Sequence, residues 1–331
     1  MRLKTVILGF GKMGKIRYRA LKAHGSFDVV ALCDLDPKNL DGYSERQFAD
    51  WQDCLNTVDC DVVFVCTYNN SIPDIVCRAL EKGCHVFAEK PPGKTLEDAQ
   101  RMQKVAERTP QCILKFGFNH RFHASVIEAK ALLDSGILGS LVCARGVYGK
   151  AGSRDFPSQW RSDKTLAGGG ILLDQGIHML DLLYYFMGPF THIQSEVDNL
   201  VWKDIRMEDN AFALLKTQDN KVASFHSSAT QWQHKFQLEL ICSQGYISLD
   251  GFNTSTQSYG QETLSYVKKD LLEETGKLGN PAKYVYIFEN DNSWALEIDE
   301  FHQAICRKRD TWNGNATDAV NIMSFIAQIY R

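Results

Sequence analysis

The chain has 331 residues, of which 44% are hydrophobic and 23% charged, and its formal net charge is −3. This composition is typical of globular proteins, so extensive disorder is excluded, and the length favours two domains. The near balance of 37 basic and 40 acidic residues argues against a general nucleic-acid binder and against electrostatic attachment to an anionic membrane.

Membrane insertion and secretion are also disfavoured. The most apolar stretch, residues 171–188, is interrupted by Asp174, His178 and Asp181, and no stretch has the roughly 18 uncharged apolar residues of a membrane span. The apolar N-terminus leads into a glycine-rich turn, as a first strand would, and not into a signal-peptide cleavage site. The ten cysteines include no CxxC pair, which favours reduced, buried thiols over a disulfide framework or a zinc site. We therefore expect a cytoplasmic protein.

The first 118 residues alternate strand-like and helix-like segments. The expected strands are continuously apolar, as strands buried on both faces should be, and cover residues 5–10, 29–33, 61–67, 85–89 and 112–118. The expected helices cover residues 12–24, 72–82 and 96–108, the last with Thr95 as its N-cap. This alternation predicts a doubly wound parallel sheet.

After Asn119 the pattern changes. A helix is expected at 123–135, a strand at 141–148, a polar loop at 149–170 and an apolar helix at 171–186. The later segments are strands at 193–200, 210–217, 221–228, 236–250, 263–268 and 284–289, a polar loop at 252–261, and closing helices at 293–307 and 318–330. Successive strands without intervening helices predict an antiparallel sheet. We expect one domain over residues 1–119 and a second over 120–331, with packing of the C-terminal helices on the first domain left open.

A glycine-rich motif with nucleotide-binding spacing ends the first strand and opens the first helix. It reads GFGKMG over residues 9–14, and Asp34 follows at the end of the second strand. In such a motif Gly9 allows a tight turn, Gly11 lets the backbone approach a pyrophosphate, and Gly14 permits close helix–strand packing. The helix N-terminus offers free N–H groups to the phosphates. Asp34 can accept hydrogen bonds from ribose hydroxyls and would repel a 2′-phosphate, which favours NAD over NADP.

Two further segments carry polar side chains suited to catalysis. Lys90 follows the fourth strand, and ligands bind at the carboxyl ends of strands in open parallel sheets. Asp174 and His178 are four residues apart, so they share one face of the expected helix, and Asp181 continues that face. Polar groups on an apolar helix are costly to bury unless they are paired. The alternatives are a solvated lysine and a structural His–Asp pair.

Together these motifs resemble those of the glucose–fructose oxidoreductase / inositol dehydrogenase / MocA family. The resemblance rests on GFGKMG with Asp34, the strand-end Glu89-Lys90-Pro91, GFNHRF at 117–122 and GGGILLDQGIHMLD at 168–181. It implies an α/β protein with an N-terminal Rossmann domain and a second α/β domain that contains a large, open, mostly antiparallel sheet. It also implies an NAD(P)-dependent oxidoreductase that acts on a CH–OH group of a sugar, an inositol or a sugar nucleotide.

The resemblance also implies roles for individual residues. The catalytic trio would be Lys90, Asp174 and His178. The expected cofactor contacts are Gly9, Phe10, Gly11, Lys12, Met13, Gly14, Asp34, Thr67, Asn69, Glu89, Lys90 and Asn119. The expected substrate contacts are Lys90, Arg121, Trp160, Arg161, Asp174 and His178.

The chain departs from the family pattern at two places. After the third strand it reads Thr67-Tyr68-Asn69-Asn70, without the Pro and the His that are usual there, and Arg121-Phe122-His123-Ala124 lacks the usual Pro. Neither change touches the trio, but both can alter how cofactor and substrate are held. His120 and His123 have no third ligand at zinc-site spacing, so no metal is expected.

These expectations predict hydride transfer with His178 as the base, Lys90 as a hydrogen-bond donor to the reacting oxygen, and Asp174 as a substrate-orienting group. Two alternatives are a catalytically silent, cofactor-binding regulator on the same fold and a reductase of a non-sugar substrate. An open sheet with one bare face also predicts a homodimer or homotetramer that buries the sheet face formed by residues 193–250. The expected partner is a small carbohydrate, with no nucleic acid and no membrane.

Overall fold

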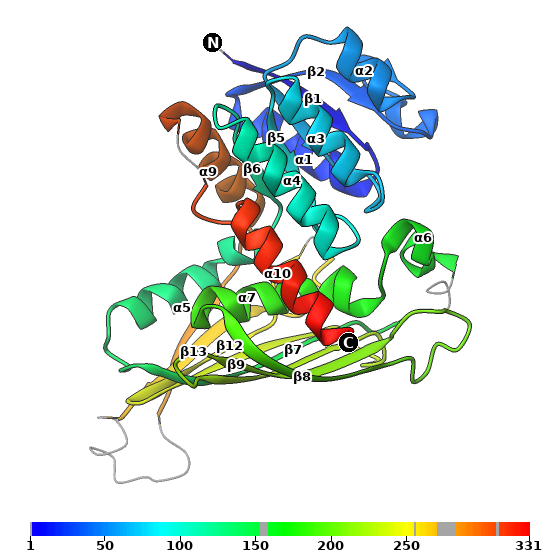
Figure 1. Cartoon of the computed structure of the whole chain (residues 1–331). Helices are drawn as coiled ribbons and strands as arrows, with labels where there is room; N and C mark the ends of the chain where they lie inside the picture. Colours follow the sequence, from blue (N-terminus) through cyan, green and yellow to red (C-terminus); the bar gives the residue numbers. More distant parts are fainter. Residues whose placement is uncertain (1, 153–157, 255, 270–281, 309–310) are drawn as a thin grey trace. The chain divides into compact units, whose positions relative to one another are not determined.

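The computed structural model describes residues 2–152, 158–254, 256–269, 282–308 and 311–331 (Figure 1). Its contacts divide the chain into two compact units. The first comprises Met1–Asn119, Thr165–Gly168 and Trp294–Ser324, and the second His120–Lys164, Gly169–Ser293 and Phe325–Arg331. The units are therefore discontinuous in sequence, because residues 165–168 and 294–324 join the first one.

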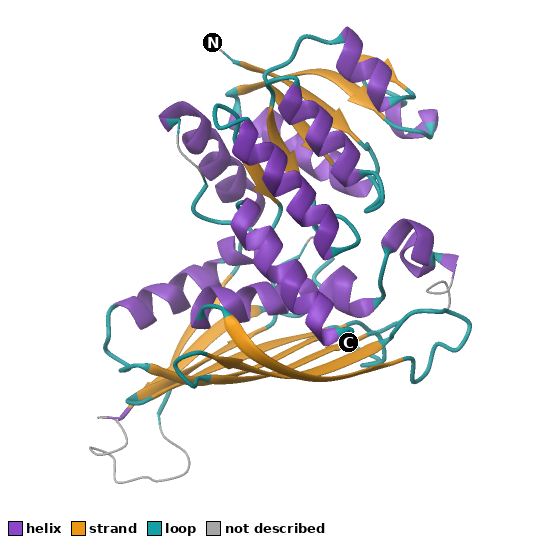
Figure 2. Cartoon of the chain, viewed as in Figure 1, coloured by secondary structure: helices purple, strands orange, loops and turns teal. Residues whose placement is uncertain are grey.

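The first unit contains a six-stranded parallel sheet in the order β3-β2-β1-β4-β5-β6, with helices on both sides (Figure 2). The strands are β1 (Leu3–Leu8), β2 (Phe27–Cys33), β3 (Arg46–Phe48), β4 (Val62–Val65), β5 (His85–Ala88) and β6 (Leu114–Phe116). The helices are α1 (Lys12–His24), α2 (Trp51–Thr57), α3 (Ile72–Glu81), α4 (Leu96–Arg108) and α9 (Ser293–Arg307), with most of α10 (Ala316–Ile329). This arrangement confirms the predicted doubly wound sheet.

Apolar side chains of the central strands form the core of the first unit. Phe64 of β4 and Phe87 of β5 stack with ring centroids 4.8 Å apart, and Phe301 of α9 meets both edge-on. Thr95 begins α4 with a capping box completed by Asp98, as the sequence predicted for the N-cap. The parallel strands thus end at one edge of the sheet, where the candidate cofactor residues lie.

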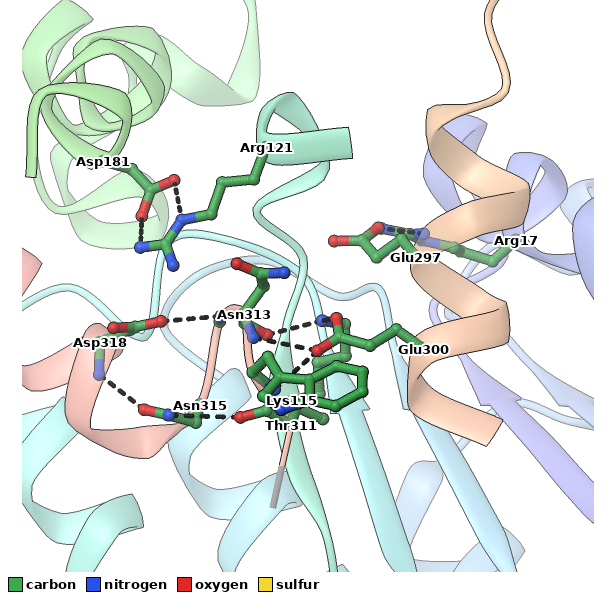
Figure 3. A network of polar contacts seen from close by, with 12 residues as sticks. Arg17, Lys115, Arg121, Asp181, Glu297, Glu300, Thr311, Asn313, Asn315 and Asp318 are labelled. Carbon is green, nitrogen blue, oxygen red and sulfur yellow. Dashed lines mark hydrogen bonds and ion pairs between the residues drawn. The ribbon is translucent and has the colours of Figure 1, made fainter. Parts of the chain in front are cut away.

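A buried ion pair anchors α9 within the same unit. Lys115 of β6 is fully buried, and its Nζ donates to Glu300 Oε2 at 2.7 Å and to the Asn313 carbonyl at 2.6 Å (Figure 3). Glu300 Oε1 accepts the backbone N–H groups of Trp312 and Asn313. Lys115 Nζ and both carboxylate oxygens of Glu300 thus have hydrogen-bond partners, which compensates the buried charges.

The second unit contains an eight-stranded sheet in the order β14-β13-β12-β11-β7-β10-β9-β8. Its strands are β7 (Leu141–Gly149), β8 (Phe190–Asp198), β9 (Asn210–Thr217), β10 (Val222–Ser228), β11 (Lys235–Cys242), β12 (Gly245–Asp250), β13 (Glu262–Lys268) and β14 (Tyr284–Phe288). All pairs are antiparallel except β10 with β7. The predicted open, mostly antiparallel sheet is therefore confirmed.

Two helices of the second unit, α5 (Ala124–Asp134) and α7 (Ile177–Met187), lie over one face of this sheet (Figure 1). The sequence expectation of one strand over residues 236–250 is wrong. Cys242 pairs with Gly245, so Ser243 and Gln244 form a tight turn between β11 and β12. Of the expected polar loops, residues 153–157 and 255 lie outside the described residues, and 164–167 form a short helix, α6 (Lys164–Ala167).

Two elements of the first unit, β3 and α2, were not predicted. Both are short, and β3 is only partly buried, so neither has a strong apolar period. No described helix combines the length and the hydropathy that crossing a lipid bilayer requires.

Candidate functional site

The glycine-rich turn between β1 and α1 has the geometry of a phosphate cradle. Gly9 has φ +86°, and a Cβ there would lie 2.5 Å from the carbonyl carbon of Cys66. A Cβ on Gly14 would lie 2.2 Å from the Gly9 carbonyl oxygen, so α1 packs directly against the turn. A Cβ on Gly11, in contrast, would meet no described atom within 4 Å. The backbone at Gly11 is therefore open at the helix N-terminus, where a pyrophosphate fits.

Asp34 lies beside this turn with its carboxylate fixed. Oδ2 accepts the backbone N–H of Phe10 at 2.6 Å. Oδ1 accepts the backbone N–H of Asp36 at 2.9 Å and the side-chain amide of Asn39 at 3.0 Å. The side chain is only half-buried, so a ribose hydroxyl pair can still approach it. The residues present thus fit the dinucleotide that the sequence predicted.

Thr67 and Asn69, expected as cofactor contacts, follow β4 at the carboxyl edge of the sheet. Thr67 Oγ1 accepts a hydrogen bond from Ser71 Oγ at 2.9 Å. Asn69 is buried, and its Nδ2 donates to the carbonyl oxygen of Ala167 at 2.8 Å. Asn69 therefore also connects residues 165–168 to the rest of the first unit. Asn119, the last residue of that unit's first segment, is buried.

Glu89 and Lys90 follow β5 at the same edge, and Lys90 precedes a cis peptide bond to Pro91. Glu89 is committed to a buried ion pair, because its Oε1 accepts from Nε of Arg17 at 2.6 Å. Arg17 lies on α1, one turn beyond Gly14, and its Nη1 donates to Glu297 of α9 at 2.7 Å (Figure 3).

Arg17 is fully buried, and its guanidinium carbon lies 4.3 Å from the ring centroid of Phe87. Burial opposes the charge, but the carboxylates of Glu89 and Glu297 prevail and raise the pKa of Arg17 above its ordinary value. The ion pair joins the helix that opens at the glycine-rich turn to the strand end that carries Lys90. Sequence reasoning missed Arg17, and its only signal was a charge on the buried face of α1.

In the second unit, Asp174 lies on a π-helix, Leu172–Gly176, that leads into α7. The expectation of one continuous α-helix from residue 171 is therefore wrong, because the first turn is wider. π-Helical turns of this kind often occur at functional sites. The wider turn changes the register between Asp174 and His178, which lies on α7.

Glu208 holds the backbone at the start of this segment. Its Oε2 accepts the N–H of Gly170 and its Oε1 accepts the N–H of Leu172, both at 3.0 Å. The hydroxyl of Tyr330 also donates to Oε1, at 2.8 Å. A Cβ on Gly170 would lie 2.1 Å from the Glu208 carbonyl oxygen, so only glycine fits this approach. Burial outweighs these hydrogen bonds and raises the pKa of Glu208.

The Asp174 carboxylate is held by two cations. Lys150 Nζ, at the end of β7, donates to Oδ2, and Arg161 Nε donates to Oδ1 at 3.0 Å. The Arg161 guanidinium carbon in turn lies 4.6 Å from the ring centroid of Trp160. The structure therefore brings three of the expected substrate contacts together, namely Trp160, Arg161 and Asp174. Lys150 was not predicted, because nothing in the sequence around a lysine at a strand end indicates that it contacts Asp174.

His178 is buried and stacks on His120, with ring centroids 3.8 Å apart and planes 15° from parallel. His120 Nε2 lies 2.8 Å from the Tyr148 hydroxyl oxygen. Burial raises the pKa of Tyr148 to about 12, so at neutral pH this phenol is a neutral hydrogen-bond donor. The sequence had suggested His120 only as a possible metal ligand. In the structure its ring contacts the ring of His178. Lys90, the third member of the expected trio, belongs to the first unit.

Arg121, expected to contact substrate, forms a two-point ion pair with Asp181 of α7. Its Nε donates to Oδ2 at 2.9 Å and its Nη2 to Oδ1 at 2.6 Å (Figure 3). Both side chains are buried. The ion pair joins residues 119–122 to α7, the helix that carries His178. Arg121 therefore has a structural role in addition to the expected contact with substrate.

Two models of one protein family match the chain. An "Oxidoreductase family, NAD-binding Rossmann fold" model matches residues 3–118, and a "GFO/IDH/MocA C-terminal domain" model matches residues 126–248. Together they cover more than half of the chain.

Two curated relatives share about a third of the aligned residues. D-glucoside 3-dehydrogenase of Escherichia coli is 32% identical over 56% of this chain and 54% of that protein. Levoglucosan dehydrogenase of Pseudarthrobacter phenanthrenivorans is 31% identical over 58% of this chain and 53% of that protein. The alignments thus span about half the length of these relatives. A solved levoglucosan dehydrogenase, in complex with NADH and levoglucosan, has a TM-score of 0.87 at 18% identity and covers 100% of this chain and 96% of its own. That likeness shows a shared fold.

Proposed function

Because the chain belongs to the GFO/IDH/MocA oxidoreductase family, we propose that it is an NAD-dependent dehydrogenase acting on a secondary alcohol of a sugar or related polyol. The observation that carries the proposal is the cradle at Gly11, which is open at the N-terminus of α1 and lies beside the fixed Asp34 carboxylate. The names of the curated relatives, a glucoside dehydrogenase and a levoglucosan dehydrogenase, favour a carbohydrate substrate. Sugar nucleotides and inositols belong to the same proposed class.

In this proposal the chain binds the cofactor through Gly9, Gly11, Gly14 and Asp34. When bound, NAD accepts or returns the hydride. His178 takes the hydroxyl proton as the alcohol becomes a ketone, since a neutral imidazole nitrogen can act as a general base. Lys90 donates a hydrogen bond to the same oxygen and stabilises its alkoxide character.

Asp174 orients the substrate in this mechanism. Lys150 and Arg161 each donate to one of its two oxygens, so the direction of the carboxylate is fixed. Each oxygen has more than one acceptor site, so Asp174 can still accept a hydrogen bond from a neighbouring substrate hydroxyl. Trp160, stacked with Arg161, supplies an apolar surface beside it.

The proposed roles predict that some substitutions lower turnover without weakening cofactor binding, and that others weaken cofactor binding. Lys90→Ala and His178→Ala should each lower kcat at least 100-fold, about 2.7 kcal/mol, with NAD affinity nearly unchanged. Gly11→Val should instead weaken NAD binding, because its side chain fills the open space at the helix N-terminus. The measurements are kcat, NAD affinity and melting temperature on the same purified variants. A folded His178→Ala enzyme with near-normal turnover would exclude His178 as the base.

Asp34 predicts the choice of nicotinamide cofactor. If its carboxylate binds the ribose hydroxyls, as the glycine-rich motif predicts, it would repel a 2′-phosphate. NAD(H) should then bind at least tenfold more tightly than NADP(H), about 1.4 kcal/mol. Asp34→Asn should reduce this preference, whereas Asp36→Asn, a change at an exposed neighbour, should leave it intact. Titration of each variant with both cofactors measures the effect. Equal affinities in the parent protein would contradict the role of Asp34.

A panel of neutral sugars, inositols and sugar nucleotides, monitored by NADH fluorescence, tests the substrate class. Turnover of one of these compounds supports the proposal. NAD binding without turnover on any of them, or turnover only of non-carbohydrate carbonyl compounds, would favour a regulator or a different reductase.

A further inference from the structure

Two cysteines of the first unit lie in contact, although the sequence gives no reason to pair them. Cys60 precedes β4 and Cys84 precedes β5, and their Sγ atoms are 3.7 Å apart. Cys84 Sγ also donates to the carbonyl oxygen of Cys60 at 3.3 Å. Both are free thiols. The two sulfur atoms are in van der Waals contact, so a disulfide bond of about 2.05 Å requires them to move less than about 2 Å closer.

The pairing of β4 with β5 brings the two cysteines close to each other. Val62 pairs with His85, and the His85 N–H donates to the carbonyl oxygen of Asp61 at 2.9 Å. Cys60 and Cys84 are therefore held at the start of two adjacent strands, whose backbones run about 4.8 Å apart. That spacing is compatible with the Cα separations of about 4.4–6.8 Å found in disulfides.

The surroundings make Cys60 the more reactive of the two thiols. The neighbouring Cys84 thiol and the Lys82 ammonium together outweigh burial and lower the pKa of Cys60. Lys82 is fixed there by the carbonyl oxygens of Leu55 and Val58. Cys60 is only half-buried, which leaves it open to small reagents.

Two buried thiols elsewhere in the first unit, Cys33 and Cys54, are less reactive than Cys60. Burial raises the pKa values of Cys33 and Cys54 to about 12, so they carry almost no thiolate at neutral pH. A partly exposed thiol of lowered pKa that lies next to a second thiol is the arrangement found in redox-sensitive cysteine pairs.

We propose that Cys60 and Cys84 form a reversible intramolecular disulfide when the protein meets a peroxide. The Cys60 thiolate attacks a peroxide oxygen, which gives a sulfenic acid and hydroxide. Cys84 then attacks the Cys60 sulfur, its S–H proton leaves with the sulfenic hydroxyl as water, and the S–S bond forms. Two thiols are oxidised by two electrons, and one peroxide is reduced to two waters. A dithiol such as dithiothreitol reverses the reaction by exchange.

The bond joins the N-terminal ends of β4 and β5, whereas Glu89 and Lys90 follow the carboxyl end of β5. The disulfide should therefore leave NAD binding unchanged. It closes a loop of the unfolded chain, so it should raise the melting temperature.

The test oxidises the full-length native protein with one equivalent of hydrogen peroxide, alkylates the remaining thiols and maps the peptides without reduction. The expected result is a linked peptide pair containing Cys60 and Cys84, with a higher melting temperature and unchanged NAD affinity. Dithiothreitol should reverse both the link and the temperature shift. Cys60→Ser and Cys84→Ser should each abolish them, and Cys306→Ser, a change at an exposed thiol, should not.

Peptides in which Cys60 and Cys84 are both alkylated after peroxide treatment would overturn the proposal. So would a Cys60 that is oxidised to sulfinic acid without linking, or a disulfide that joins either residue to a different cysteine. Because mapping is performed on the unmutated protein, the result does not depend on whether the serine variants fold.

Discussion

The buried carboxylate of Asp209 shows how backbone N–H groups, joined by the side-chain amide of Asn210, can hold a charge in the interior. Its Oδ1 accepts the N–H of Leu200, and its Oδ2 accepts those of Val201 and Trp202, all at 2.8 Å. Burial favours the neutral form, but these hydrogen bonds to the ionised form prevail and lower the pKa of Asp209. Asp209 therefore fixes the chain that connects β8 to β9.

This arrangement predicts an acid-sensitive contribution to stability. Because the folded-state pKa of Asp209 lies below its ordinary value of 3.8, its contribution is present above the unfolded pKa and is lost as pH falls through the folded pKa. Asp209→Asn should cost about 1–3 kcal/mol at pH 7, and the difference from the parent should shrink below about pH 4. Urea unfolding between pH 2 and 7 measures it, with the exposed Asp204→Asn as the control. A difference that stays constant with pH would contradict this role.

At the scale of elements, Glu208 and Tyr330 fix the start of the segment that carries Asp174. Tyr330→Phe removes the hydroxyl that donates to Glu208 Oε1 and leaves that oxygen with the N–H of Leu172. We expect a loss of about 1 kcal/mol in unfolding free energy. Tyr286→Phe, at an exposed residue of β14, should change it by less than about 0.5 kcal/mol. Denaturant unfolding of both variants measures these losses of unfolding free energy. Equal losses would show that the Tyr330 hydroxyl makes no specific contribution to stability.

Most elements were predictable because their signals are local. Thr95 with Asp98 located the start of α4, and continuous apolar runs located the central strands β1, β4 and β5. The π-helix was not predictable, because the apolar pattern does not separate a wider first turn from an α-helical one. The contacts of Glu208 with the N–H groups of Gly170 and Leu172, where this segment begins, come from a residue far away in sequence. The turn between β11 and β12 was missed because Ser243-Gln244 lacks the glycine or asparagine that marks most tight hairpins.

The residues of the candidate site likewise fall into two groups, those predictable from a local motif and those that depend on distant partners. Gly9, Gly11, Gly14 and Asp34 could be predicted as cofactor contacts, because a short motif with fixed spacing carries them. The structure confirms that Gly9 and Gly14 must be glycines, since both approach other backbone atoms too closely for any side chain. Arg17, Lys150 and His120 were not identified as site residues, because their importance comes from partners 72, 24 and 58 positions away, Glu89, Asp174 and His178.

At the scale of the whole molecule, the second unit has a sheet face that no described helix covers (Figure 2). Along β9 the burial alternates, and Phe212 and Leu214 point out of this face with 44% and 52% of their surface exposed. The ring of His226 on β10 stacks on Phe212 with centroids 3.9 Å apart. Apolar side chains gathered on one face of a sheet commonly mark a surface that another chain covers.

We therefore expect a homodimer or homotetramer that buries this face between copies of the chain. Leu214→Glu places a charge where the apolar surface would be buried, so it should shift the assembly towards monomers at micromolar concentration. Ile127→Glu is the matched control, because Ile127 is similarly exposed on α5, over the opposite face of the same sheet, and its replacement should not alter the assembly. Light scattering coupled to size exclusion gives the mass of each protein. A monomeric mass for the unmutated protein would refute the expected assembly, and an unchanged oligomer for Leu214→Glu would place the interface on another surface.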